Sequence, residues 1–341
     1  IVLASIMSLG AGAVSAQTNA PAKALQESQR LTHTATSNKS MVASVHPIAT
    51  QAGLNALEQG GNAIDAAIAT ALTLGVVDGF NSGIGGGCFI LIRSSDGEVY
   101  AIDGREMAPA AAHSNLYRDA LRDNSNGNKQ PSQVGALASG VPGALAAYRQ
   151  AVTKHGRLKF NDLILPAAEI ADEGFQVTQA YESRLQSVKK SMSLFPGSTA
   201  VFFRKRAGEA EATPYQTGEK LKQTDLANTY RQIAQKGPSW FYNGPFALQT
   251  EQWMKANGGI MTALDFANYR TVDRSPIRTT YRGFEVIGFP PPSSGGVHVA
   301  QILNILESFD LKKLYEDDPA QMYHVVAEAM KFAFADRAEW L

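Results

Sequence analysis

Apolar and polar positions change along the chain in blocks that predict a mixture of helices and strands. Residues 41–77 contain a proline suited to a first helical position and a central glycine pair, in the sequence MVASVHPIATQAGLNALEQGGNAIDAAIATALTLGVV. They predict one helix that begins at Pro47 and ends at Gly60 and Gly61. A second helix, capped by Asn62 and extending to about Val77, is so rich in alanine that most of its sides should be buried.

A glycine-rich stretch, NSGIGGGCFILIR, follows at positions 81–93. The apolar runs CFILIR and EVYAID flank SSDG, whose Asp-Gly pair is typical of a tight turn, so they predict a β-hairpin. A phosphate-binding loop has the opposite order, with a strand first and a helix after the glycines, and usually ends in Gly-Lys-Ser/Thr, which is absent. The glycines therefore lead into a hairpin, and nucleotide binding is not indicated.

The middle of the chain predicts further helices. The first runs from Pro142 and Gly143 to Gly156, and the second starts or is kinked at Pro166 and ends at Gly174. Residues 176–222 have a mixed pattern that favours loops. The stretch TDLANTYRQIAQKGPSWFYNG then predicts a helix with a Gly-Pro stop.

The last third predicts short strands, a rigid proline run and two helices. Ser293 and Ser294 precede the first of these helices and are interpreted as caps rather than as nucleophiles. The second is long and amphipathic and begins at Asp318 and Pro319. It continues to Leu341 without a cap, so we expect the sequence to be a fragment of a longer chain.

Composition indicates a globular protein. Of 341 residues, 44% are hydrophobic and 18% are charged, which supplies a sizeable core and excludes a disordered chain. Lys plus Arg equals Asp plus Glu at 31 each, and this balance argues against a nucleic-acid partner. No internal repeat or linker divides the sequence.

The N-terminus is typical of an export signal. Residues 1–16 are apolar and small and end in Ala-Val-Ser-Ala, which predicts a signal-peptide remnant cut after Ala16. The apolar part is too short to span a bilayer as a helix, so no stable membrane span is expected. Polar residues 17–40 predict a flexible leader, and the protein is expected to be periplasmic or secreted. The alternative is that the first residues form an apolar strand or helix of the mature fold.

Most candidate chemistry can be set aside from the residue pattern. The six histidines show no pair at metal-ligand spacing, no acidic cluster has calcium-loop spacing, and Gly-x-Ser-x-Gly is absent. Cys88 is the single cysteine, so no internal disulfide can form, and a buried structural thiol is favoured over a nucleophile.

Arg105 remains as a candidate binding residue. It follows the second hairpin strand in IDGREMAP, and its guanidinium could grip a carboxylate with two parallel hydrogen bonds beside the glycine run. The alternative is a surface arginine paired with Glu106 or Asp103. The residues alone leave both interpretations open.

Six motifs in order resemble the large subunit of bacterial γ-glutamyltranspeptidase. They are GIGGGCFILIR, IDGREMAP, GVPGALAAYRQAVTKHG, LPAAEIADEGFQV, PPPSSGGVHVAQILNILE and EAMKFAFADRAEWL. The similarity runs from about Met41 to Leu341, so residues 41–341 are interpreted as a large-subunit region truncated before the small subunit. The resemblance implies an α+β fold, the four-layer αββα sandwich of N-terminal nucleophile hydrolases, of which this chain holds an incomplete part.

The resemblance also implies an activity and a site. The family's carboxylate-binding arginine corresponds to Arg105, and the glycine run lies near the γ-glutamyl pocket. The nucleophile is the Thr that begins the small subunit after self-cleavage, in a Thr-Thr-His type motif that these residues lack. No catalytic residue is therefore expected in this chain, and the Thr is expected beyond Leu341. The implied partners are glutathione or another γ-glutamyl substrate, an amino acid, peptide or water as acceptor, and the small subunit, with no cofactor or metal.

Two other functions remain open. One is a related acylase of the glutaryl-cephalosporin type, whose pocket would be lined by the small subunit. The other is a non-catalytic exported homologue that never cleaves itself and acts as a binding protein.

Overall fold

The computed structural model describes residues 35–123 and 129–341. Residues 40–341 form one unit by their mutual contacts. The expected signal peptide, residues 1–16, lies outside the described residues, as does most of the expected leader. Residues 35–40, the described end of that leader, contain no helix or strand.

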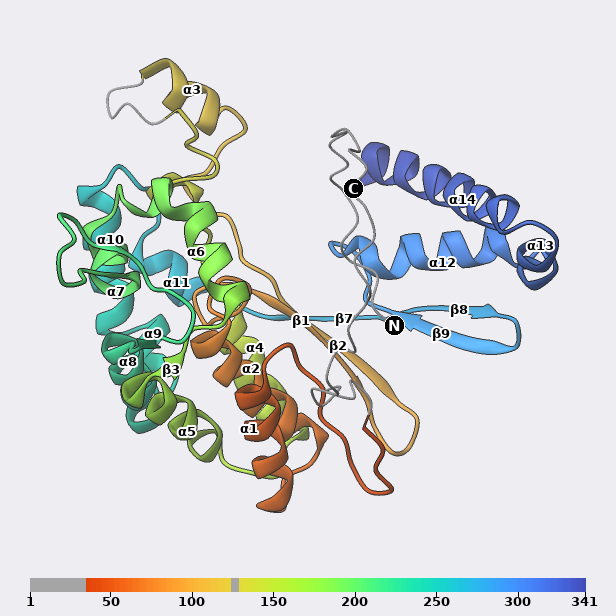
Figure 1. The fold of residues 1–341 in the computed structure, drawn as a ribbon, viewed down its shortest axis with the longest axis horizontal. Helices are drawn as coiled ribbons and strands as arrows, with labels where there is room; N and C mark the ends of the chain where they lie inside the picture. Colours follow the sequence, from red (N-terminus) through yellow and green to blue (C-terminus); the bar gives the residue numbers. More distant parts are fainter. Residues whose placement is uncertain (1–34, 124–128) are drawn as a thin grey trace, which may run out of the picture. The chain divides into compact units, whose positions relative to one another are not determined.

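The described chain forms helices and mostly short strands, which follow one another in runs of like elements (Figure 1). The helices are α1 (Pro47–Glu58), α2 (Ala63–Val77), α3 (Leu116–Asp123), the 3-10 helix η1 (Ala136–Ala138), α4 (Ala144–His155), α5 (Phe160–Glu173), α6 (Gln179–Met192), α7 (Pro196–Phe202), α8 (Thr224–Lys236), α9 (Ser239–Tyr242), α10 (Pro245–Ala256), α11 (Ala263–Asn268), α12 (Ser294–Leu306), α13 (Leu311–Asp317) and α14 (Pro319–Trp340). The strands are β1 (Cys88–Arg93), β2 (Val99–Gly104), β3 (Phe175–Gln176), β4 (Phe203–Arg204), β5 (Thr213–Pro214), β6 (Lys220–Leu221), β7 (Val272–Arg274), β8 (Ile277–Tyr281) and β9 (Phe284–Gly288). The mixture of helices and strands that the patterning predicts is confirmed, and it agrees with the α+β fold that the resemblance implies.

The first two helices form as their caps predict. Pro47 begins α1, and the Asn62 side chain accepts hydrogen bonds from the N–H groups of Ile64 and Asp65 at the start of α2. The Asp65 carboxylate in turn accepts a hydrogen bond from the Asn62 N–H, which completes a capping box. Ten of the 15 residues of α2 are buried, as its alanine-rich sequence predicts.

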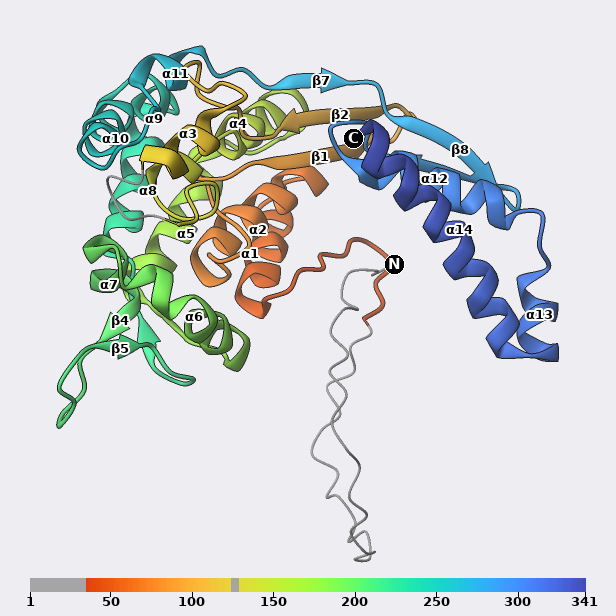
Figure 2. The same cartoon turned by 90° about the horizontal axis from the view of Figure 1, so that it is seen from above.

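The sheet that carries the candidate site has the order β1-β2-β7. Strands β1 and β2 form the predicted hairpin, with Cys88 opposite Gly104 and Arg93 opposite Val99. Strand β7 pairs antiparallel with the other edge of β2, so that a strand about 170 positions later in sequence lies beside it (Figure 2). Helix α4 packs directly on β2, because a Cβ added at Gly104 would lie 2.5 Å from the Cβ of Ala147.

The core lies among α2, α4, α5 and α8, whose apolar faces pack against one another. Leu72, Leu145, Ile164 and Ile233, one from each of these helices, are fully buried. The buried Tyr230 hydroxyl donates to the Leu72 carbonyl at 3.1 Å, which satisfies a polar group inside this core.

Two expectations about the middle of the chain need correction. Of the two interpretations of Pro166, a helix start and a kink, the first is wrong, because the proline lies inside α5, which begins at Phe160. The buried face that includes Leu163 and Ala167 continues across the proline, and this packing outweighs the missing backbone donor. Residues 176–222 are not mainly loop, since they include α6 and α7. Helix α6 is largely polar and buries only Tyr181 and Leu185, so its apolar signal is weak.

The C-terminal elements pack through a close backbone contact. Helix α12 contacts β8, β9 and α14. A Cβ at Gly288 of β9 would lie 2.5 Å from the Cα of Gly296 in α12, so both positions need glycine for this approach. Ser293 caps α12 and Asp318 caps α14, as predicted.

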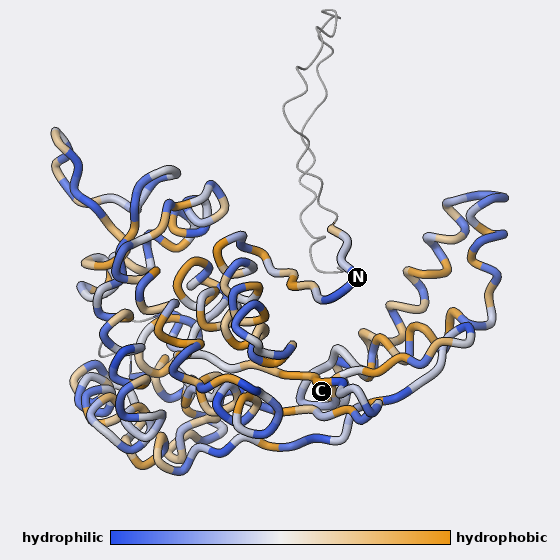
Figure 3. The backbone as a smooth tube through the Cα atoms, turned by 90° about the horizontal axis from the view of Figure 1, so that it is seen from below, coloured by the Kyte–Doolittle hydropathy of each residue, from blue (hydrophilic) through white to orange (hydrophobic). Residues whose placement is uncertain are grey.

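Hydrophobic and hydrophilic segments alternate along the described backbone (Figure 3). No described helix is both long and apolar enough to cross a membrane.

Candidate active site

The glycine run forms a close-packed connection between α2 and β1. The Gly86 carbonyl accepts hydrogen bonds from the N–H groups of Gly143 and Ala144, both at 3.0 Å, at the start of α4. A Cβ at Gly87 would lie 2.5 Å from Oε2 of Glu106 and 2.8 Å from the Glu106 nitrogen. Gly87 is therefore required because the backbone there passes close to the Glu106 carboxylate, and the Gly86 carbonyl binds the N-terminus of α4. The chain runs from a helix into a strand, the order that the sequence predicts and the opposite of a phosphate loop.

Arg105 lies immediately after β2 and points its guanidinium outward. Its side chain is 62% exposed, and its Nε lies 3.9 Å from Oε2 of Glu106. The guanidinium carbon lies 5.9 Å from the ring centroid of Phe89 in β1. An exposed pair at this distance is weak, so the guanidinium is free to exchange Glu106 for another carboxylate.

The backbone of Arg105 is held more firmly than its side chain. Its N–H donates to Oδ1 of Asp103 at 2.9 Å, and its carbonyl accepts from the Tyr269 hydroxyl at 2.8 Å. The second Asp103 oxygen accepts from Nε and Nη2 of Arg274 in β7, at 3.0 and 2.8 Å. Asp103 therefore pairs with Arg274 and not with the Arg105 guanidinium, whereas the anticipated contact between Arg105 and Glu106 is present.

Two cavities meet at Glu106. One, of about 530 Å³, is lined by the glycine run together with Cys88, Glu106 and Tyr148. The other, of about 370 Å³, is lined by Arg105 and Glu106 and by residues from 107–117 and 137–140. Arg105 thus lines a cavity that shares Glu106 with the cavity beside the glycine run.

Cys88 has the properties of a structural thiol. Burial, together with the nearby carboxylates of Glu106 and Asp103, raises its pKa to about 12. The thiolate, which is the nucleophilic form, is therefore disfavoured at neutral pH. Its sulfur would lie 3.2 Å from a Cβ at Gly104, so it fills space between β1 and β2.

The remaining candidates have no catalytic arrangement. The Ser293 hydroxyl accepts from the Gly295 N–H at 3.2 Å and serves as the cap of α12. Among the described residues, no group of three His, Cys, Asp or Glu side chains is arranged to hold a metal ion.

Sequence reasoning missed the groups that support Arg105. Tyr269 lies 164 positions and Arg274 lies 169 positions after Arg105. Neither residue belongs to a local motif, so no signal in the sequence connects them to the REMAP segment. Glu106 was considered only as an ion-pair partner, although its position beside the arginine could have indicated that it borders the site.

The chain has the α+β fold of the N-terminal nucleophile hydrolases. The family model for γ-glutamyltranspeptidase matches residues 49–341, and the chain belongs to this family.

Comparisons with known proteins give the extent of the similarity. The chain is 40% identical to the glutathione hydrolase proenzyme of Escherichia coli (strain K12), over 100% of this chain and 57% of that protein. It is 38% identical to the acylase ACY 1 proenzyme of Pseudomonas sp. (strain V22), over 89% of this chain and 54% of that protein. The crystal structure of Helicobacter pylori γ-glutamyltranspeptidase is similar with a TM-score of 0.83 and 38% identity, over 90% of this chain and 86% of that one. The chain spans about half the length of the curated relatives it matches.

Proposed function

We propose that this chain is the large-subunit region of an exported γ-glutamyltransferase and glutathione hydrolase. The observation that carries the proposal is the position of Arg105. In a chain of the γ-glutamyltranspeptidase family, its exposed guanidinium lies after β2, at a cavity that shares Glu106 with the cavity lined by the glycine run. Relatives that are named glutathione hydrolase support the same activity.

Arg105 would bind the α-carboxylate of the substrate. A guanidinium presents two parallel N–H donors, which match the two oxygens of a carboxylate. In the free protein the nearest anion is the half-exposed Glu106 carboxylate at 3.9 Å, too far for a hydrogen bond. The substrate carboxylate can therefore displace a weak contact and gain a bidentate one.

The rest of the reaction uses groups outside this chain. A Thr hydroxyl at the start of the small subunit attacks the γ-carbonyl of the substrate, with its own α-amine as the base. Backbone donors of the small subunit hold the oxyanion that forms. The γ-glutamyl-enzyme then transfers its acyl group to an amino acid, a peptide or water, and no cofactor takes part.

The acylase relatives support a second candidate. A glutaryl group keeps the terminal carboxylate of a γ-glutamyl group and lacks only the α-ammonium, so Arg105 could bind either. The choice between them depends on the groups that bind the ammonium, and these are proposed to lie in the small subunit. The similarity to acylase ACY 1, at 38% identity, makes this alternative worth testing directly.

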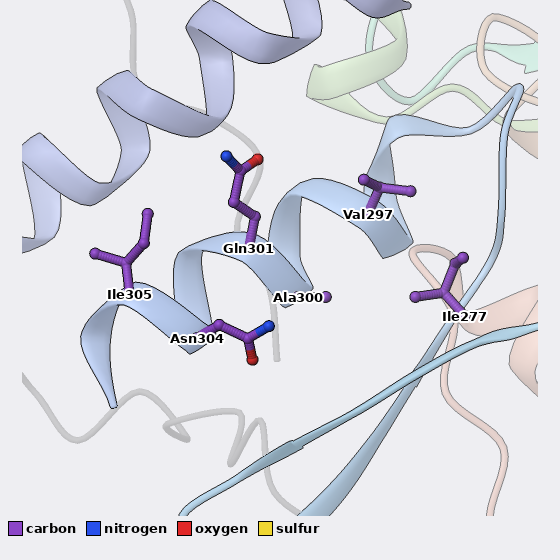
Figure 4. A pocket seen from close by; sticks show the side chains of 6 residues that line it. All are labelled: Ile277, Val297, Ala300, Gln301, Asn304 and Ile305. Atoms are coloured by element: carbon purple, nitrogen blue, oxygen red, sulfur yellow. The ribbon is translucent and has the colours of Figure 1, made fainter. Parts of the chain in front are cut away.

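The exposed apolar side chains of the C-terminal helices are proposed to contact the small subunit. In α14, Phe332, Phe334 and Trp340 are more than half exposed, and Trp340 reaches 78%. A further hollow of about 500 Å³ lies between β8 and α12. It is lined by four apolar side chains and two amides, namely Ile277, Val297, Ala300, Ile305, Gln301 and Asn304 (Figure 4). Large apolar patches of this kind usually mark an interface.

Export is part of the proposal and rests on the apolar N-terminal residues. We propose cleavage after Ala16, which would leave Gln17 as the first residue of periplasmic or secreted protein. N-terminal sequencing of the exported protein tests this. Recovery of exported protein that still carries residues 1–16 would contradict it.

The activity is tested with the full-length protein and two anilides. We expect γ-glutamyl-p-nitroanilide to be hydrolysed, with faster release when an amino-acid acceptor is added, and glutaryl-p-nitroanilide to be a poor substrate. Preferential turnover of the glutaryl compound would support the acylase instead. Binding of glutamate without self-cleavage or turnover would support a non-catalytic binding protein. Residues 17–341 expressed alone should be inactive, because they lack the Thr nucleophile.

A further inference from the structure

Two hydrogen bonds fix the backbone of Arg105 from opposite sides, and both depend on a short segment after α11. The Tyr269 hydroxyl donates a hydrogen bond to the Arg105 carbonyl oxygen at 2.8 Å. Arg274 holds Asp103, whose other oxygen accepts the Arg105 N–H. Residues 269–274 therefore act on both peptide groups of Arg105 without contact to its guanidinium.

We propose that residues 269–274 are a positioning segment that sets where the Arg105 guanidinium meets the substrate carboxylate. This inference rests on the proposed function and extends it, because it assigns roles to Tyr269 and Arg274 that act through Arg105. Of the substrate groups, only the α-carboxylate depends on the position that Tyr269 and Arg274 give to Arg105. Loss of either contact should therefore weaken recognition of that carboxylate more than any other step.

The Tyr269 hydroxyl is itself held in place. Its ring stacks on Tyr242, with centroids 5.8 Å apart and planes 17° apart, and the residue is 6% exposed. A Cβ at Gly143 would lie 2.0 Å from the Tyr269 oxygen, so the glycine leaves the space that the hydroxyl occupies. Burial raises the pKa of this phenol, and the hydroxyl keeps its proton and acts as a donor at neutral pH.

The Asp103–Arg274 pair supplies the other support. The Asp103 side chain is only 7% exposed, and its carboxylate accepts from Arg274 and from the Arg105 backbone. A buried carboxylate keeps its position when its oxygens are occupied in this way. The register of β2 and β7, with Ala101 opposite Arg274, brings the two side chains together.

The Arg105 side chain has few restraints of its own. It is largely exposed, and its described neighbours are the Glu106 carboxylate at 3.9 Å and the Phe89 ring at 5.9 Å. Its starting point must therefore be set through the backbone. A displacement of the peptide would move the guanidinium relative to the nucleophile, and errors of about 1 Å can cost about 100-fold in rate.

The experiment compares substrates with and without the carboxylate in the full-length protein. The probes are γ-glutamyl-p-nitroanilide and 4-aminobutyryl-p-nitroanilide, which keeps the ammonium but lacks the α-carboxylate. Tyr269→Phe removes the hydroxyl and retains the stacked ring. We expect kcat/KM for the γ-glutamyl compound to fall about tenfold, with less than about a twofold change for the 4-aminobutyryl compound. If the latter is not hydrolysed, its inhibition constant against the γ-glutamyl compound replaces kcat/KM.

The matched control is Tyr230→Phe. It removes a buried hydroxyl that donates to the Leu72 carbonyl at 3.1 Å, a bond of the same kind that does not involve Arg105. It should leave the ratio of the two kinetic constants unchanged. An equal loss for both compounds in Tyr269→Phe, or no loss for either, would overturn the inference. In an Arg105→Ala background, Tyr269→Phe should give no further loss for the γ-glutamyl compound, because the two residues act in series.

A second, independent experiment tests Arg274. Arg274→Ala should reduce the same ratio. Arg231→Ala, which removes a more exposed arginine–aspartate pair with Asp172 at 2.9 Å away from Arg105, should not. An unchanged ratio in Arg274→Ala would exclude Arg274 from the segment. If wild-type protein fails to hydrolyse the γ-glutamyl compound, the proposed function is wrong. If wild-type protein hydrolyses the γ-glutamyl compound and Tyr269→Phe does so with the same kcat/KM, only the positioning role is wrong.

Discussion

The buried carboxylate of Asp65 accepts a hydrogen bond from the backbone N–H of Arg157, 92 positions later, at 2.9 Å. The same side chain accepts from the Leu158 N–H at 3.2 Å and from the Asn62 N–H at 2.8 Å. One aspartate thus caps α2 and holds the loop between α4 and α5 to it. A fully buried carboxylate is stabilised only when such donors surround it.

Asp65→Ala should destabilise the protein strongly. It leaves three backbone N–H groups without their acceptor and removes the capping box, which together should cost about 3 kcal/mol of the free energy of unfolding. Thermal unfolding of the full-length protein measures the effect as a lower midpoint. Asp225→Ala, which removes an exposed first-turn aspartate of α8, is the control and should cost about 0.5 kcal/mol or less. Similar midpoints for the two variants would contradict this account.

Arg105→Ala should impair catalysis without preventing self-cleavage. Loss of the charge and of the positioning should cost about 2–5 kcal/mol in kcat/KM for γ-glutamyl-p-nitroanilide. Arg105→Lys should recover only part, because an ammonium cannot present two coplanar donors. Arg93→Ala, at the exposed end of β1 in the same hairpin, is the control and should keep wild-type activity. Normal maturation with near wild-type kcat/KM in Arg105→Ala would make Arg105 an ordinary surface residue.

Gly87→Ala and Gly85→Ala should differ sharply although they lie two positions apart. A Cβ at Gly87 would lie 2.5 Å from the Glu106 carboxylate and 2.8 Å from its backbone nitrogen, so Glu106 and the adjoining Arg105 must move. A Cβ at Gly85 meets nothing within 4 Å. We expect kcat/KM to fall by about tenfold or more in Gly87→Ala and to stay near the wild-type value in Gly85→Ala. Equal activity in both variants would show that the close approach is not needed.

His46 should make stability depend on pH below neutrality. Its Nδ1 accepts from the Ile48 N–H at the start of α1, which requires the neutral ring. Burial lowers the pKa of His46, an effect that the nearby Asp78 charge opposes. Because the folded pKa lies below the unfolded value of about 6.5, the unfolded state binds more protons. The contribution is therefore complete above about pH 6.5 and is lost as the pH falls through the folded pKa.

The comparison that isolates this effect is between His46→Asn and His113→Asn. Asparagine can still cap the helix but does not titrate, so His46→Asn should flatten the change in the thermal midpoint between pH 7.5 and pH 5. The exposed His113 should have no influence on that change. A wild-type pH profile in His46→Asn would rule out the histidine as its source.

Local signals in the sequence predicted much of the fold, because caps and turns act over a few residues. Asn62, Ser293 and Asp318 cap the helices they were expected to cap, and the Asp-Gly turn joins β1 to β2. The polar helix α6 was missed because its few buried residues give little periodicity. Arg105 could be selected as a candidate from its place after a strand and from the family resemblance, and its role stays a prediction.

The supports of Arg105 could not be predicted for a different reason. Tyr269 contacts the Arg105 carbonyl, and Arg274 binds Asp103, which accepts the Arg105 N–H. The pairing of β7 with β2 brings this distant segment beside Arg105. Local sequence patterns do not specify which distant strands pair, and neither a tyrosine before a strand nor an arginine at the end of one has a distinctive signature. The same limit applies to Asp103, whose partner proved to be Arg274.

The pairing of β7 with β2 also has a consequence for the order of folding. Register between Asp103 and Val272 closes a loop of nearly 170 residues, and contacts of such separation form slowly. The β1–β2 hairpin and the α1–α2 pair depend on nearby residues and can form first. The carboxylate-binding geometry proposed for Arg105 is therefore completed only after α11 and β7 have been synthesised and docked. A nascent chain that ends before Tyr269 contains the arginine without its supports.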